Sequence, residues 1–136
     1  MGFLFFKSKP KHPPECIAAY NSLCNVPFYK FYLRKIPKYC PIDKILWIEA
    51  AVIENNIVKS FRINYYSEKY KENVDTKISF RKYGHHGLTE SEFSNFMRYL
   101  SVALHKNKFM FLERGFDDCN AGCVYDRKYA KKIFFL

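Results

Sequence analysis

Two adjacent histidines lie in the stretch of this chain with the most chemical potential, residues 81–89. His85 and His86 are flanked by a glycine on each side, and Arg81 and Lys82 precede them. Imidazole titrates near neutral pH, so one ring could serve as a base and the other as an acid. With a cation holding a phosphodiester, this combination is typical of metal-independent RNA cleavage. The residues of that reaction would be His85, His86 and Arg81.

The same pair also has a simpler interpretation. Adjacent histidines in a loop are commonly surface residues, and neighbouring side chains of an extended segment point in opposite directions. The two rings would then not reach one substrate. The chain contains no Gly-x-Ser-x-Gly, Walker or dinucleotide fingerprint. The sequence therefore favours a protein that is not an enzyme and has no cofactor, with cleavage by the histidines as the alternative.

Cysteine spacing bears on metal binding and on the redox compartment. Cys119 and Cys123 are four residues apart, which suits one half of a zinc site, but no second pair exists. We therefore predict no metal, leave any metal role of these two residues open, and interpret the cysteines as small apolar side chains. The total of five is odd and no secretory signal precedes it, so we expect reduced thiols and a cytoplasmic protein.

Aromatic and basic residues alternate between residues 26 and 41, a segment that three prolines also interrupt. It is either a short helix between prolines or an irregular surface segment. Tyrosine and arginine are favoured at protein interfaces, and bases with aromatic rings also bind nucleic acid. In a third interpretation, the aromatic rings belong to the hydrophobic core and the basic side chains extend past them into solvent. The candidate contact residues are Tyr29, Lys30, Tyr32, Arg34, Lys35, Lys38, Arg81 and Lys82.

The positive charge is unevenly distributed. The chain of 136 residues has 23 bases and 13 acids, a net charge of +10. Residues 1–42 hold seven bases and one acid, which is +6, and the two following thirds hold +2 each. We therefore expect a protein partner with an acidic face, with RNA or DNA as the alternative. No apolar stretch is long enough to span a membrane, and the pattern predicts no oligomeric state.

The chain is expected to form one domain, residues 1–136, of which residues 1–14 are a basic, proline-containing arm. The strongest helix prediction is 89–106, where Thr89 and Glu92 form a capping box before an apolar stripe. A shorter helix is predicted at 15–24, after two prolines that suit a helix start.

Strands are indicated by alternation of apolar and polar residues. A hairpin is predicted at 45–66, with its turn at Asn55 and Asn56, because asparagine tolerates positive φ. Within it, residues 45–53 fit a strand better than a helix, although both remain open. Further strands are predicted at 76–83 and 109–112, and 124–136 is a final strand or a docked tail. The fold class is α+β: an antiparallel sheet of about four to five strands, with two helices packed on one face.

These features favour a small, stand-alone binding protein over an enzyme. The first hypothesis is that it docks on a protein partner and inhibits or neutralises it, as immunity proteins and inhibitors from mobile elements do. This hypothesis rests on small size, a basic, tyrosine-rich surface and the lack of a catalytic motif. The alternative is a nucleic-acid-binding protein or a metal-independent ribonuclease that uses His85 and His86.

Overall fold

The structure is a computed structural model that describes residues 12–113 and 121–135. The greater part of the predicted N-terminal arm, residues 1–11, and Cys119 lie outside these ranges. The helices are α1 (Pro14–Leu23), α2 (Pro27–Tyr39), α3 (Glu90–Ala103) and α4 (Arg127–Phe134), with 3-10 turns η1 (Ile42–Lys44) and η2 (Arg81–Tyr83). The strands are β2 (Ile45–Glu54), β3 (Ile57–Ser67), β4 (Glu72–Ser79), β5 (Leu88–Thr89), β6 (Phe109–Leu112) and β7 (Cys123–Asp126).

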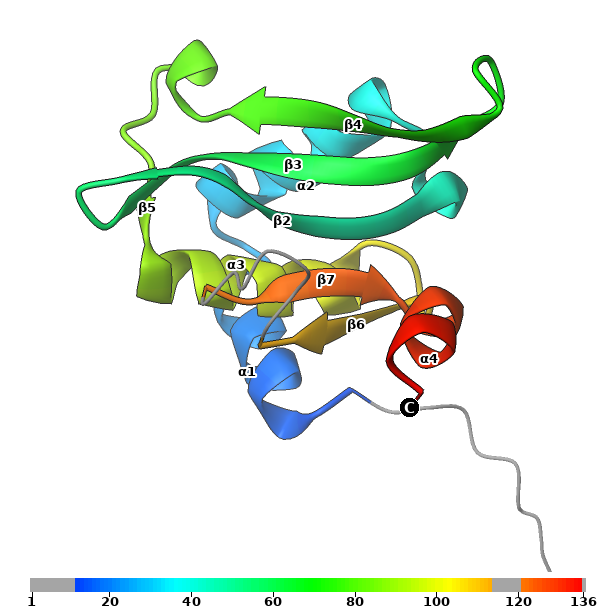
Figure 1. The fold of residues 1–136 in the computed structure, drawn as a ribbon. Coiled ribbons are helices and arrows are strands. Elements are labelled where there is room, and N and C mark those ends of the chain that lie inside the picture. Colours follow the sequence, from blue (N-terminus) through cyan, green and yellow to red (C-terminus); the bar gives the residue numbers. More distant parts are fainter. Residues whose placement is uncertain (1–11, 114–120, 136) are drawn as a thin grey trace, which may run out of the picture.

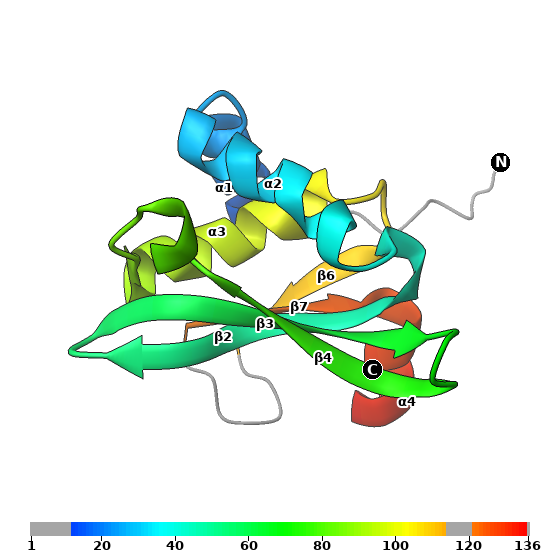
Figure 2. The same ribbon diagram turned by 90° about the horizontal axis from the view of Figure 1, so that it is seen from above.

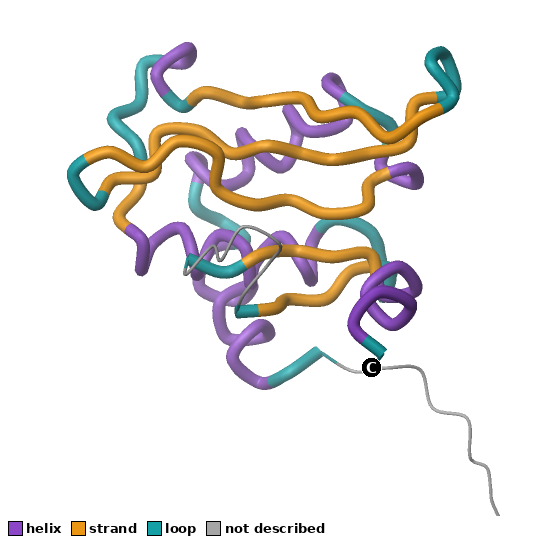
Figure 3. Tube along the Cα trace, viewed as in Figure 1, coloured by secondary structure: helices purple, strands orange, loops and turns teal. Residues whose placement is uncertain are grey.

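The described strands form one antiparallel, six-stranded sheet, coloured orange in Figure 3. Its order is β4-β3-β2-β7-β6, and β5 adds a short pairing to the start of β3. Helices α1, α2 and α3 cover one face, whereas α4 lies on the other face (Figures 1 and 2). The α+β class and the antiparallel sheet predicted from the sequence are therefore confirmed.

The β2–β3 hairpin forms as predicted, so residues 45–53 are a strand and not a helix. β2 pairs with β3 on one side and with β7 on the other. Asn55 and Asn56 have φ of 52° and 65°, the left-handed values that a tight hairpin turn requires. Because side chains alternate along β3, Phe61 enters the core while its neighbours Ser60 and Arg62 belong to the opposite face.

The core lies between this sheet and α3. The apolar stripe of α3 is fully buried, and it includes Phe93, Phe96, Met97 and Leu100. Its capping box is present, since the Glu92 amide donates to Thr89 Oγ1 at 3.1 Å and the Thr89 amide donates to Glu92 Oε1 at 2.9 Å. Three-to-four-residue spacing thus predicted this helix correctly, although it ends at Ala103 rather than at residue 106.

The described part of the chain has four helices where the sequence predicted two, and for residues 26–41 the sequence left a short helix and an irregular segment open. The segment with alternating aromatic and basic residues is the helix α2, which begins with Pro27 and accommodates Pro37 in its last turn. The C-terminal segment, predicted as a strand or docked tail, is strand β7 followed by helix α4. Asp126 caps α4 by accepting from the Tyr129 amide at 2.9 Å, and the Tyr129 ring stacks on Trp47. Packing on the second face, which the sequence did not indicate, therefore supports α4.

His12 links the N-terminal segment to the start of α4. The guanidinium of Arg127 donates to His12 Nδ1 at 3.2 Å, and it also donates to the Asn107 carbonyl at 2.8 Å. Burial and the nearby positive charge of Arg127 lower the pKa of His12, against a smaller opposing effect from the backbone at Lys106. The folded state therefore favours the neutral ring.

Stability should fall as the pH drops below about 6.5, the ordinary pKa of a histidine. The unfolded chain then takes up a proton that folded His12 accepts only at lower pH, so protonation favours unfolding. His12→Gln should remove this part of the pH dependence in urea unfolding curves recorded from pH 7 to pH 5. The matched control is His105→Gln, which replaces an exposed histidine and leaves the contact between His12 and Arg127 in place. Equal curves for both variants would show that His12 does not contribute.

Candidate functional site

The segment that carries the two histidines leaves the sheet at Phe80, which is fully buried. After the η2 turn, Gly84 adopts φ of 81°, and the His85 amide donates back to the Phe80 carbonyl at 3.0 Å. The chain then crosses the end of the β2–β3 hairpin and pairs with β3 as β5. This path places residues 81–87 between α2 on one side and, on the other, the sheet face opposite α1, α2 and α3.

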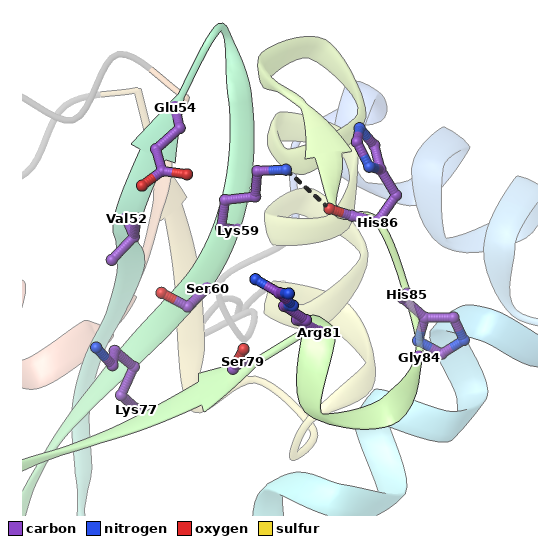
Figure 4. A pocket seen from close by; sticks show the side chains of 10 residues that line it. All are labelled: Val52, Glu54, Lys59, Ser60, Lys77, Ser79, Arg81, Gly84, His85 and His86. Atoms are coloured by element: carbon purple, nitrogen blue, oxygen red, sulfur yellow. Dashed lines mark hydrogen bonds between the residues drawn. The ribbon is translucent and has the colours of Figure 1, made fainter.

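The two histidine side chains have different surroundings. His85 Nδ1 and Tyr32 Oη are joined by a 2.5 Å hydrogen bond, and the His85 ring centroid is 4.8 Å from that of Phe28 on α2. His86 is exposed, and its carbonyl accepts from Lys59 Nζ at 3.5 Å. Figure 4 shows the two rings pointing in different directions from the segment. His85 therefore ties this segment to α2, and the structure does not bring the two imidazoles together.

Gly87 brings this segment into close contact with β3. A Cβ atom at Gly87 would lie 2.5 Å from the Val58 carbonyl oxygen and 2.7 Å from Ile57 Cγ2, and φ here is 127°. Only glycine allows such an approach, because any larger residue would displace the backbone of β3. The next residue, Leu88, then pairs with Val58. The position of both histidines thus depends on Gly87.

Alanine substitutions at the two glycines should separate steric contact from backbone strain. Gly84→Ala introduces only strain at positive φ, since nothing lies within 4 Å of the added Cβ, and should cost about 1 kcal/mol. Gly87→Ala adds a collision with Val58 and should lower the free energy of unfolding by about 2 kcal/mol or more. Urea denaturation measures both. A Gly87 variant no less stable than the Gly84 variant would contradict the close approach.

The outer face of α2 carries a row of cations. Lys30, Arg34 and Lys38 are each four residues apart, so they lie on one side of the helix, and all three are exposed. The helix contains no acidic residue. We call these three residues the α2 basic stripe. The opposite side of α2 faces the core through Tyr32 and Ile36, which are fully buried.

Next to the stripe, a pair of tyrosines joins α2 to η2. Tyr39 Oη and Tyr83 Oη are 2.6 Å apart, and Lys82 Nζ donates to Tyr39 Oη at 3.4 Å. The Lys35 ammonium lies 5.2 Å from the centre of the Tyr83 ring. The hydrogen bond from Tyr83, together with the nearby lysines, lowers the pKa of Tyr39. We call these four residues, Lys35, Tyr39, Lys82 and Tyr83, the Tyr–Lys cluster.

The structure brings most of the predicted contact residues together, but not all. Tyr32 is fully buried, so it belongs to the core and not to a surface. Tyr29 is half-buried, with its ring centroid 5.6 Å from that of Phe96, and burial raises the pKa of its hydroxyl. Arg81 lies in a pocket, apart from its neighbour Lys82. The residues that remain together on the outer side of α2 and η2 are Lys30, Arg34, Lys35, Lys38 and Lys82.

The pocket that contains Arg81 has a volume of about 630 Å³ (Figure 4). It is formed by the ends of β2 and β4, the start of β3 and the segment after η2. Its polar and charged side chains include Glu54, Lys59, Ser60, Lys77, Ser79 and Arg81. His85 and His86 also line the pocket, so it contains all three residues that the sequence singled out for RNA cleavage, Arg81, His85 and His86. The alternation along β3 and β4 could have shown that Ser60, Lys77 and Ser79 share a face, but not that this face forms a pocket.

The chain matches no known family model, and no curated protein or solved structure is significantly similar to it. Within the described ranges, no three His, Cys, Asp or Glu side chains are placed to hold a metal ion together. No helix in the described part of the chain is both long enough and apolar enough to cross a membrane. Function must therefore be inferred from the surfaces themselves.

Proposed function

We propose that this protein is a small, non-enzymatic binding protein that docks on an acidic face of a protein partner and inhibits or neutralises it. The observation that carries the proposal is the α2 basic stripe, three exposed cations on one face of a helix without an acidic residue. Immunity proteins and mobile-element inhibitors act in this general manner. The outer side of α2 and η2 would be the docking surface.

The spacing of the stripe supports electrostatic attraction of an acidic partner. Lys30 and Lys38 are two helical turns apart, about 12 Å along the axis. Neighbouring charges of the stripe are only about 6 Å apart along the axis, which is within the screening length of about 8 Å at physiological salt, so they act together on an approaching partner. Such a field raises the rate of association more than it slows dissociation.

The Tyr–Lys cluster supplies a different kind of contact at the end of the stripe. Tyr39 and Tyr83 are half-buried and hydrogen-bonded to one another, so their rings are held in place before a partner arrives. Tyrosines that lose little freedom on binding are favoured anchors at interfaces. The proposed surface therefore combines cations that attract a partner with rigid aromatic side chains that it can cover.

The test begins with affinity capture from the native cell, followed by association kinetics with the purified partner. The variant Lys30→Glu, Arg34→Glu, Lys38→Glu should reduce the association rate by about 10-fold or more at low salt. Its matched control changes Lys128, Lys131 and Lys132 to Glu, since these residues are also exposed and lie on α4. The control has the same net charge and should bind far faster than the α2 variant.

Two results would contradict the proposal. Equal rates for the two triple variants would assign the effect to net charge and not to α2. Capture of RNA or DNA that dissociates at moderate salt, in place of a stoichiometric protein, would instead identify the nucleic-acid alternative. In that case, loss of RNA cleavage in His85→Ala or His86→Ala would identify a ribonuclease.

A further inference from the structure

The pocket beside η2 has the size and the composition of a binding site for a small charged molecule. Its volume of about 630 Å³ falls within the range of sites for small ligands. It lies on the sheet face opposite α2, because Ser60 and Ser79 are cross-strand partners that alternate with the core residues Phe61 and Ile78. It is therefore separate from the proposed docking surface.

Three cations line this pocket, more than its one carboxylate can balance. None of the ion pairs between described residues includes Lys59, Lys77 or Arg81. Glu54 also lines the pocket, so the local charge is three positive and one negative, or +2. A phosphate monoester carries a charge of about −1.5 to −2 at pH 7 and would neutralise it. The charge balance thus favours a phosphorylated ligand over a singly charged carboxylate.

A buried hydroxyl provides an independent indication of a ligand. Ser60 is only 3% exposed, and its Oγ has no hydrogen-bond partner, although it lines the pocket. Buried polar groups normally find partners, so an unpaired hydroxyl at a pocket wall indicates a missing one. Its register partner Ser79 places a second hydroxyl beside it. Figure 4 shows both serines near Arg81, between Lys77 and the segment after η2.

We propose that this pocket binds a phosphorylated sugar or nucleotide. Arg81 and Lys77 would hold the phosphate, because guanidinium groups make paired hydrogen bonds to phosphate oxygens and lysine adds a point charge. Ser60 and Ser79 would donate their hydroxyls to the same group. Glu54 lies toward the hairpin end of the pocket, away from Lys77 (Figure 4). Its carboxylate would repel a phosphate but accept hydrogen bonds from sugar hydroxyls.

Isothermal titration calorimetry of the full chain with ribose 5-phosphate tests this proposal. We expect saturable binding that weakens about 10-fold or more in Arg81→Ala and in Lys77→Ala, as loss of a charged contact to phosphate does. Lys69→Ala is the matched control, since Lys69 is an exposed cation in the β3–β4 connection, outside the pocket. Arg81 and Lys77 are also exposed, so their replacement should leave the fold intact, which circular dichroism checks.

The sugar is tested separately from the phosphate. Glu54→Gln should weaken binding of ribose 5-phosphate while leaving or strengthening that of inorganic phosphate, because only the sugar donates to this carboxylate. Inorganic phosphate that binds as tightly as ribose 5-phosphate would overturn the assignment of a sugar. The absence of ribose 5-phosphate binding at about 10 mM would overturn the proposed site. Arg81-dependent binding of single-stranded RNA, without binding of ribose 5-phosphate, would also overturn it. None of these outcomes depends on α2, so the two proposals can fail independently.

Discussion

Phe80 joins the layers of this molecule, and the arrangement of both candidate surfaces depends on its packing. Its buried ring lies 5.0 Å from the ring of Tyr32 on α2, 5.5 Å from that of Phe61 on β3 and 6.4 Å from that of Phe96 on α3, measured between centroids. It follows β4 directly, so its burial fixes where the chain leaves the sheet. The next two residues then separate. Arg81 enters the pocket, and Lys82 reaches Tyr39 on α2.

The two surfaces differ in shape as well as in position. The α2 basic stripe lies on the outside of a helix, where its cations are solvated and can approach a large acidic surface. The cations of the pocket surround a buried hydroxyl in a hollow of about 630 Å³, where only a small group or one end of a chain fits. Positive charge on a protein does not by itself identify a partner. The local shape and the hydrogen-bonding groups beside each charge make the distinction.

Several features could be predicted because they depend on residues close together in the sequence. The capping box at Thr89 satisfies helix amides three residues away, and the turn at Asn55 and Asn56 depends on the backbone freedom of asparagine. Other features depend on distant contacts. The segment that became α2 contains three prolines within residues 26–41, and burial of Tyr32 between Phe80 and His85 favours the helix over an irregular path. The helix α4 similarly depends on Trp47, far away in the sequence.

By itself, the sequence determined the α+β class, the hairpin, the stripe of α3 and the candidate cations at Lys30, Arg34 and Lys38. The fold features follow from periodicity, capping and turn-forming residues, which act over a few residues, whereas the three cations were singled out by their alternation with aromatic residues. Only the tertiary structure decided that Tyr32 is core, that His85 and His86 have separate environments, and that Lys77 and Ser60 line a pocket with Arg81. Those residues come from different strands and a turn, and they meet because strand register and the burial of Phe80 bring them together.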